Sequence, residues 1–262
     1  MSGACLLFGA SLAIYLEPIL GWGVWGLFLV TIVGAALASS YVERLCFAPH
    51  GKRQGDVTAM VASFAVWMQL DEISSQLLPQ RTHAFQGIEV PNFWWGELFV
   101  RGDQLLHFAI ALVSILLLYL LLYKTRFGLL VRATADSSET AHLLGAPVPW
   151  LGFTIFLVAG ILGGLAAFMI LSADGYVTPL FGLWSTFKGL VAMIIGGVGS
   201  LVGAVLGGLI LGLVETHAGA ALGAEFRDMV TFGMVFLVLI IRPGGLMGVK
   251  IYRTDNLAQE RV

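Results

Sequence analysis

Residues 186–218 read TFKGLVAMIIGGVGSLVGAVLGGLILGLVETHA, and this stretch decides how the chain crosses a membrane. As one continuous α-helix it would extend about 50 Å, which is too long for an ordinary span. The segment GGVGS at 196–200 interrupts it with residues that tolerate positive φ and break helices. We therefore predict two short helices, 186–196 and 201–218, joined at this glycine-rich break.

The composition of the whole chain is that of a membrane protein. Of its 262 residues, 58% are hydrophobic and only 11% are charged, whereas soluble domains carry roughly a quarter charged residues. The net charge of −2 provides no basic field for binding nucleic acid. The composition predicts an all-α, polytopic bundle with about seven to eight spans, including the two short glycine-broken helices, in a single transmembrane domain covering 1–262.

The remaining spans follow from the length of the bilayer core, because a core of ~30 Å needs about 20 apolar helical residues. The first apolar segment lacks the positive n-region of a signal peptide and is taken as a membrane helix, with Glu17 and Pro18 at its predicted outer end. Beside the broken stretch, the segments that qualify are 3–16, 19–42, 57–78, 105–123, 150–172 and 229–241.

The positions of Lys and Arg predict the orientation. These residues concentrate in loop 43–56, in loop 124–149 and in the tail after residue 241, and we predict that all three regions are cytoplasmic. Loop 79–104 has mixed charge and many aromatic residues, and fits the outer side. The break at 196–200 supplies the extra crossing that returns the tail to the cytoplasm.

Interrupted helices often line a transport path, because irregular backbone at membrane depth lies beside protein or a watery cavity. The charged residues of the broken stretch face a cavity or a partner under this interpretation, and lie at the outer interface under the alternative. Glycines spaced by four, such as Gly160 and Gly164, also allow close helix packing, and packing alone is the alternative for the whole glycine pattern. The candidate path residues are Lys188, Gly196, Gly197, Gly199, Ser200 and Glu215.

Loop 124–149 contains signals for a short helix over 137–144. Asp136 is a suitable N-cap, and Glu139 three residues later can reach back to the N–H of the cap. Gly145 suits the position after the helix end, and Pro147 prevents continuation.

This predicted helix presents a small apolar surface formed by Ala141, Leu144 and Gly145. One interpretation places that surface on lipid headgroups, but a lipid-binding helix favours Lys and Arg on its polar face, where this one has Asp136 and Glu139. A protein partner on the cytoplasmic side is the favoured interpretation.

The sequence contains none of the usual signatures of catalysis. There is no Gly-x-x-x-x-Gly-Lys-Ser/Thr loop, no His-Glu-x-x-His and no Gly-x-Ser-x-Gly, and the five histidines have no ligand spacing. Cys5 and Cys46 form neither a disulfide framework nor a metal site and are predicted to pack as small apolar residues. We predict no catalytic residue, no metal, no cofactor and no enzymatic activity in this chain.

Four ordered blocks carry a resemblance to a known family. The block TRFGLLVRATADSSETAHLLGAPV at 125–148 resembles the cytoplasmic coupling loop of the branched-chain amino acid ABC transporter permease family. YVERLCFAP at 41–49, the glycine-rich block at 188–215, and FRDMVTFGMVFLVLIIRPGGLMG at 226–248 resemble three further segments of the same family, in the same order. The resemblance covers nearly the whole chain. The family's usual first span, which precedes these blocks, has no match here, so a fragment, a misplaced start and a shortened permease all stay open.

The resemblance implies a permease subunit of an ATP-driven importer in the bacterial inner membrane, with branched-chain or related small polar amino acids as substrates. It implies four kinds of contact: two ATP-binding cassette ATPase subunits, a second homologous permease, a periplasmic solute-binding protein, and membrane lipid. The ATPases are expected to push on helix 137–144, so the expected coupling residues are Asp136, Glu139, Ala141, Leu144 and Gly145. An ATP-independent channel or secondary transporter and an inactive membrane scaffold are the alternatives.

Overall fold

The protein is described by a computed structural model that covers residues 2–20, 23–47, 56–77, 93–95, 98–175, 181–242 and 244–247. Its contacts form two compact units, residues 1–186 and 187–262, with the boundary inside one helix. Loops 43–56 and 79–104, which carry predictions of orientation, lie partly outside the described residues, and the tail after residue 247 lies wholly outside them.

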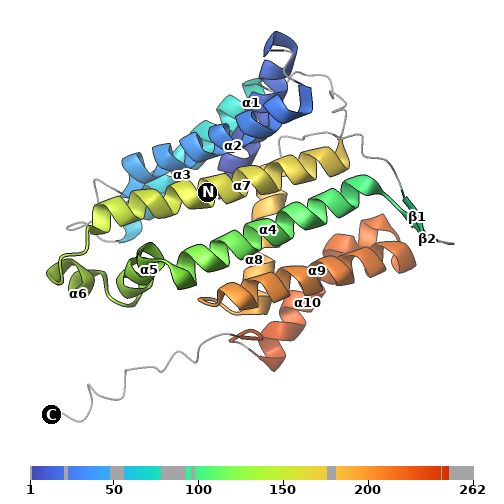
Figure 1. The fold of residues 1–262 in the computed structure, drawn as a ribbon. Coiled ribbons are helices and arrows are strands. Elements are labelled where there is room, and N and C mark those ends of the chain that lie inside the picture. The colour runs from blue at the N-terminus through green and yellow to red at the C-terminus, as the bar shows by residue number, and fades with distance from the viewer. Residues whose placement is uncertain are drawn as a thin grey trace. The chain divides into compact units, whose positions relative to one another are not determined.

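Unit 1 contains most of the helices (Figure 1). Two three-residue strands, β1 (Phe93–Trp95) and β2 (Leu98–Val100), pair antiparallel with Trp94 opposite Phe99. They are the only strands in the described part of the chain. The prediction of an all-α bundle is therefore confirmed apart from this short hairpin. In chain order the elements are α1 Ser2–Leu20, α2 Gly23–Val42, the π-helical turn η1 Glu43–Phe47, α3 Asp56–Leu77, β1 Phe93–Trp95, β2 Leu98–Val100, α4 Gly102–Lys124, α5 Arg126–Asp136, α6 Ser138–Leu143, α7 Val148–Asp174 and the start of α8 Phe181–Gly196.

Two predicted boundaries in unit 1 differ from the structure. α1 continues through Pro18 to Leu20, so this proline does not end the helix as predicted. A proline removes one backbone hydrogen bond and crowds the preceding turn, but a helix can continue through it with a kink. In loop 124–149 the structure contains a second helix, α5, before the predicted short one.

Several helices have the length and hydropathy needed to cross a bilayer. Four described segments are long and apolar enough, namely Gly23–Phe47, Gly102–Lys124, Val148–Ala173 and Leu201–Leu222. Three shorter apolar helices accompany them at Gly3–Leu16, Phe181–Gly196 and Met229–Ile241. A chain with this many apolar helices is a multi-pass membrane protein.

At the centre of unit 1, α2 packs against both α1 and α7. Small residues make this close packing possible. On α7, a Cβ added at Gly164 would lie 2.6 Å from the Cα of Ile32, and one added at Gly160 would lie 2.7 Å from the Cβ of Ser39. Only glycine permits this approach of two backbones. The predicted packing role of Gly160 and Gly164 is confirmed.

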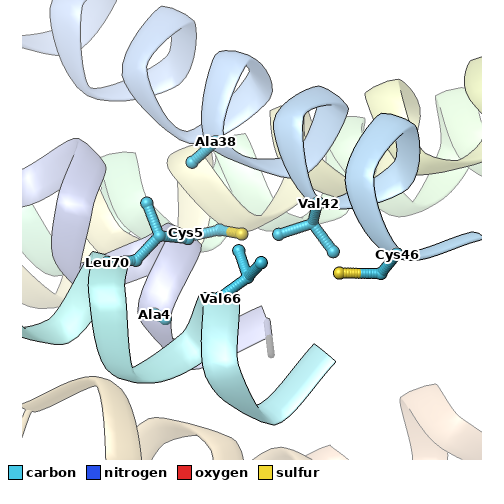
Figure 2. Close-up of a cluster of buried hydrophobic side chains, with 7 residues drawn as sticks. All are labelled: Ala4, Cys5, Ala38, Val42, Cys46, Val66 and Leu70. Carbon is cyan, nitrogen blue, oxygen red and sulfur yellow. The ribbon is translucent and has the colours of Figure 1, made fainter. Parts of the chain in front are cut away.

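A second contact region of unit 1 joins α1, α2 and α3 through the buried cluster drawn in Figure 2. Both cysteines belong to it and both are free thiols. They come from α1 and from η1, and their sulfurs lie on either side of Val42 among apolar side chains (Figure 2). Their predicted role as packing residues is confirmed.

Unit 2 is built from the rest of α8, from α9 Leu201–Leu222, from the short turn η2 Ala224–Phe226 and from α10 Arg227–Ile241 (Figure 1). α8 ends at Gly196 and α9 begins at Leu201, so the predicted break is confirmed. α9 is longer than expected, because it continues four residues beyond the predicted end at residue 218. The three helices share an apolar core formed by Val191, Ile195 and Leu211, against which Met234, Val235 and Val238 pack.

Candidate functional site

The glycine-rich break forms a tight helical hairpin in unit 2. Gly197 and Gly199 adopt φ values of +105° and +90°, a region that favours glycine. Ser200 is the N-cap of α9, and its hydroxyl accepts a hydrogen bond from the Gly203 N–H at 3.0 Å. The four predicted path residues of this cluster, Gly196, Gly197, Gly199 and Ser200, thus form the turn between two membrane helices.

The glycines that follow the turn allow α8 and α9 to touch through their backbones. A Cβ added at Gly207 would lie 2.7 Å from the Gly196 nitrogen and would overlap the Ala192 carbonyl oxygen. Gly212 lies five residues further along α9, and among the described residues nothing beyond the adjacent turns of α9 comes within 4 Å of its added Cβ. The glycines of α9 therefore divide into a packed row and an open row, and only the packed row is explained by contacts within this chain.

A second turn, after α10, supplies hydrogen-bond donors to the free carbonyls at the C-terminal end of α8. Gly245 has φ +74° and lies against Gly197. The N–H of Leu246 donates to the Ile195 carbonyl and the N–H of Met247 to the Gly196 carbonyl, both at 2.9 Å. Carbonyls at a helix end need such partners when water is absent. The C-terminal ends of α8 and α10 and the start of α9 therefore lie at the same end of unit 2.

The two charged candidates of the broken stretch form an ion pair. Lys188 on α8 and Glu215 on α9 are joined by a hydrogen bond from the Lys188 Nζ to the Glu215 Oε1. The Glu215 side chain is 16% exposed and the Lys188 side chain 43% exposed. At 1.5 Å per residue, Glu215 lies about 20 Å along α9 from Leu201, between the two ends of a helix about 33 Å long. Charged residues at membrane depth are rare and usually have a partner or a function.

A buried hydroxyl group in the same unit lacks a hydrogen bond. Within the described part of the chain, three buried polar side-chain atoms have no hydrogen-bond partner: the Nε2 of His107, the Oγ of Ser172 and the Oγ1 of Thr231. Thr231 lies on α10 and is 3% exposed. A buried hydroxyl without a partner is unusual enough to need an explanation. No local pattern in the sequence marks Thr231, because its burial depends on how the helices of unit 2 pack.

The connection from α4 to loop 124–149 is a sharp turn built on Thr125 and Gly128. Thr125 caps α5, and its hydroxyl accepts a hydrogen bond from the Gly128 N–H at 3.1 Å. A Cβ at Gly128 would overlap the backbone carbonyl of Leu122. The guanidinium of Arg132 lies 5.0 Å from the ring centre of Tyr123 and links α5 back to α4. These contacts hold α5 in a defined orientation against α4, and α5 leads directly into α6.

The predicted short helix is present as α6, but its cap differs from the prediction. Asp136 is the last residue of α5, and the N-cap is Ser137, whose hydroxyl accepts from the Thr140 N–H at 3.3 Å. An N-cap needs an extended backbone, which Ser137 has with φ −156° and ψ 104°, whereas Asp136 is already helical. The predicted end is confirmed, because Gly145 follows the helix with φ +88°.

The apolar surface predicted on this helix divides into two parts. Ala141 is 4% exposed and packs within the chain, while Leu144 is 84% exposed. Its neighbour Leu143, which was not among the predicted contact residues, is 81% exposed. Glu139 and Gly145 are also exposed. Two adjacent leucines that lie almost wholly outside the fold form an unpaired apolar tip at the end of α6.

The described residues provide no set of ligands for a metal ion. No group of three or more His, Cys, Asp or Glu side chains comes together in the part of the chain that the structure covers. The features that remain as candidates for function are the exposed tip of α6 and, in unit 2, the glycine-rich turn with the nearby ion pair.

Comparison with known proteins gives consistent matches over most of the chain. The family described as "Branched-chain amino acid transport system / permease component" matches residues 2–239. The permease protein BraD of the high-affinity branched-chain amino acid transport system of Pseudomonas aeruginosa is 28% identical, covering 84% of this chain and 73% of that protein. The corresponding permease LivH of Escherichia coli is 27% identical, covering 86% of this chain and 75% of LivH.

A probable branched-chain amino acid permease LivH from Methanocaldococcus jannaschii is also 27% identical and covers 97% of this chain and 84% of that protein. No solved structure matches the chain. The names of all three relatives describe permeases of branched-chain amino acid transport.

Proposed function

This chain belongs to the family of permease components of branched-chain amino acid transport systems, and from that membership we propose that it is the membrane subunit of an ATP-driven amino acid importer. The proposed substrates are branched-chain or related small amino acids, and the proposed location is the inner membrane of a bacterium. The observation that carries the proposal is the family match over residues 2–239 in a chain whose helices suit a bilayer.

The geometry of α5 and α6 supports coupling to separate ATPase subunits. A protein without its own ATP-binding loop needs a contact through which a partner can act. The tip at Leu143 and Leu144 is an apolar surface with no partner among the residues that the structure describes. The turn at Thr125 and Gly128 ties this tip to α4. We propose that the ATPases contact the tip, with Glu139 and Gly145 at its edge and with Asp136 and Ala141 holding α6 in place.

The glycine-rich turn and the ion pair support a transport path beside unit 2. The turn interrupts an apolar stretch with irregular backbone, and interrupted helices line the path in other transporters. Substrate would cross beside α8 and α9 as the permease alternates between outward and inward access. A second homologous permease would form the other side, and a periplasmic solute-binding protein would deliver the substrate.

A reconstitution experiment tests the proposal. We expect uptake of radiolabelled leucine into proteoliposomes only when this chain is assembled with a second permease, the ATPases and the binding protein, and when ATP is supplied inside. Uptake by this chain alone, driven by a concentration gradient without ATP, would instead identify a channel or secondary transporter. A fully assembled complex that transports no amino acid would leave the chain as a membrane scaffold.

Labelling of single cysteines tests the proposed orientation. We expect a cysteine placed at Lys250 to react with a membrane-impermeant maleimide only after the cytoplasmic side is opened, because the broken stretch returns the tail to that side. A cysteine at Leu222, at the far end of α9, should react from outside in intact cells. The two native cysteines are buried, and labelling of the unaltered protein measures their background reaction with the maleimide. Reaction of position 250 in intact cells would contradict the arrangement of α8 and α9 in the membrane.

A further inference from the structure

We propose that Lys188, Glu215 and Thr231 bind the ammonium and carboxylate groups of an α-amino acid zwitterion, an inference that rests on the proposed transport function. The three residues come from α8, α9 and α10, the three main helices of unit 2. None of the three belongs to the apolar core of that unit. Their common feature is that each continues a core-facing stripe of its helix.

The spacing along each helix places the three side chains beside the core. Residues three, four or seven apart share a helix face. Lys188 is three residues before Val191, Glu215 is four after Leu211, and Thr231 is four before Val235, and these three apolar residues belong to the buried core of unit 2 or pack against it. The polar residues therefore form the layer next to the apolar one, towards the end of the unit away from the glycine-rich turn.

The contact between α9 and α10 places Glu215 and Thr231 at the same level. A Cβ added at Gly219 of α9 would lie 2.5 Å from the Nε of Arg227 on α10, so these two residues are neighbours. The two helices are antiparallel, because α9 leads away from the glycine-rich turn and α10 returns to it. Four residues inward from Gly219 is Glu215, and four residues inward from Arg227 is Thr231.

The polar atoms of these three side chains can still form hydrogen bonds with a ligand. Lys188 and Glu215 are paired with each other, and with side-chain exposures of 43% and 16% both charged groups remain partly accessible. The hydroxyl of Thr231 is buried and has no hydrogen-bond partner. A ligand that carries one positive and one negative group would use all three residues.

The exchange with a zwitterion preserves the charge balance of the site. The ammonium of the ligand donates to the Glu215 carboxylate, the carboxylate of the ligand accepts from the Lys188 ammonium, and the Thr231 hydroxyl donates to that same carboxylate. One ion pair is replaced by two, and the net charge at membrane depth stays zero. A ligand with only one charged group would leave either Lys188 or Glu215 without a partner.

The neighbouring core suggests which zwitterions fit. The aliphatic side chains of Val191, Leu211 and Val235 form or pack against the apolar core, about one helical turn from the three polar residues. An amino acid with a small branched aliphatic side chain can lie along this surface, whereas a charged side chain would have to be desolvated there. The inferred ligand class is therefore the zwitterion of an apolar α-amino acid.

The test measures equilibrium binding of radiolabelled leucine to the assembled transporter in nanodiscs, without the solute-binding protein. We expect Glu215→Gln and Lys188→Gln each to weaken binding at least tenfold, because each leaves one charge of the ligand unpaired. Thr231→Val should weaken binding several-fold and Thr231→Ser should restore it. The matched controls Glu225→Gln and Thr216→Val alter exposed residues and should bind leucine as the unaltered protein does.

Competition on the unaltered transporter tests the same inference without any substitution. Leucinamide lacks the carboxylate and 4-methylpentanoate lacks the ammonium, and both should compete at least tenfold more weakly than isoleucine. Equal competition by the three compounds, or unchanged binding in Glu215→Gln, would overturn the inference. ATP-driven uptake of leucine in that same preparation would show that the proposed function stands even if the binding site is wrong.

Discussion

Replacing Gly207 by leucine should separate α8 from α9 and destabilise the folded chain. The added side chain would meet the carbonyl oxygen of Ala192 and the backbone of Gly196, neither of which can move without moving a helix. Overfilling a packed contact costs about 1–3 kcal/mol, and a clash with backbone lies at the upper end of that range. We expect the midpoint of thermal unfolding, followed by tryptophan fluorescence in detergent, to fall by roughly 5–10 °C.

Gly212→Leu is the matched control for this substitution. It makes the same chemical change on the same helix, but within the described part of the chain nothing beyond the adjacent turns of α9 lies within 4 Å of the added Cβ. Both substitutions gain helix propensity of about 1 kcal/mol, so the difference between them reports packing alone. Equal unfolding temperatures for the two variants would show that the backbone contact between α8 and α9 does not hold the hairpin together.

Replacing Leu144 by aspartate should release the ATPase subunits from the permease. Leu144 is 84% exposed at the end of α6, so the substitution leaves the fold of the chain intact and places a charge in the proposed contact. Exposed leucines become buried when a partner docks, and loss of a central contact residue typically costs 2 kcal/mol or more, about a thirtyfold loss of affinity. We expect the ATPase to be lost when the permease is purified through an affinity tag.

The control is Leu222→Asp, which makes the same change at another exposed leucine. Leu222 ends α9 and lies on the outer side in the proposed orientation, so the ATPase should still purify with this variant. Leu143→Asp should act as Leu144→Asp does. An intact complex with both Leu143→Asp and Leu144→Asp would contradict the docking role of α6.

The sequence predicted features whose cause is local. The break between α8 and α9 was predictable because two glycines with positive φ and a capping serine stand next to one another in the chain. The end of α6 was predictable from Gly145 for the same reason. The start of α6 was predicted one residue early, because Asp136 and Ser137 are both good caps and only the end of α5 decides between them.

Contacts between segments that are distant in the chain could not be predicted from the sequence. Lys188 and Glu215 were both selected as candidates, but their pairing depends on how α8 and α9 fold back on each other. No sequence pattern around Thr231 predicts its burial. Leu143 could not be distinguished from other apolar residues, because the burial of Ala141 is what shows which side of α6 faces outward. The family resemblance supplied the class of protein and none of these contacts.

The hydrogen bonds that Leu246 and Met247 donate to the end of α8 also constrain biogenesis. A ribosome releases α8 some fifty residues before it releases the turn that completes it. Until synthesis is nearly finished, the carbonyls of Ile195 and Gly196 have to remain in water or inside the insertion machinery, because hydrocarbon offers them no donor. We therefore expect the hairpin of α8 and α9 to settle into lipid only after this last turn has been made.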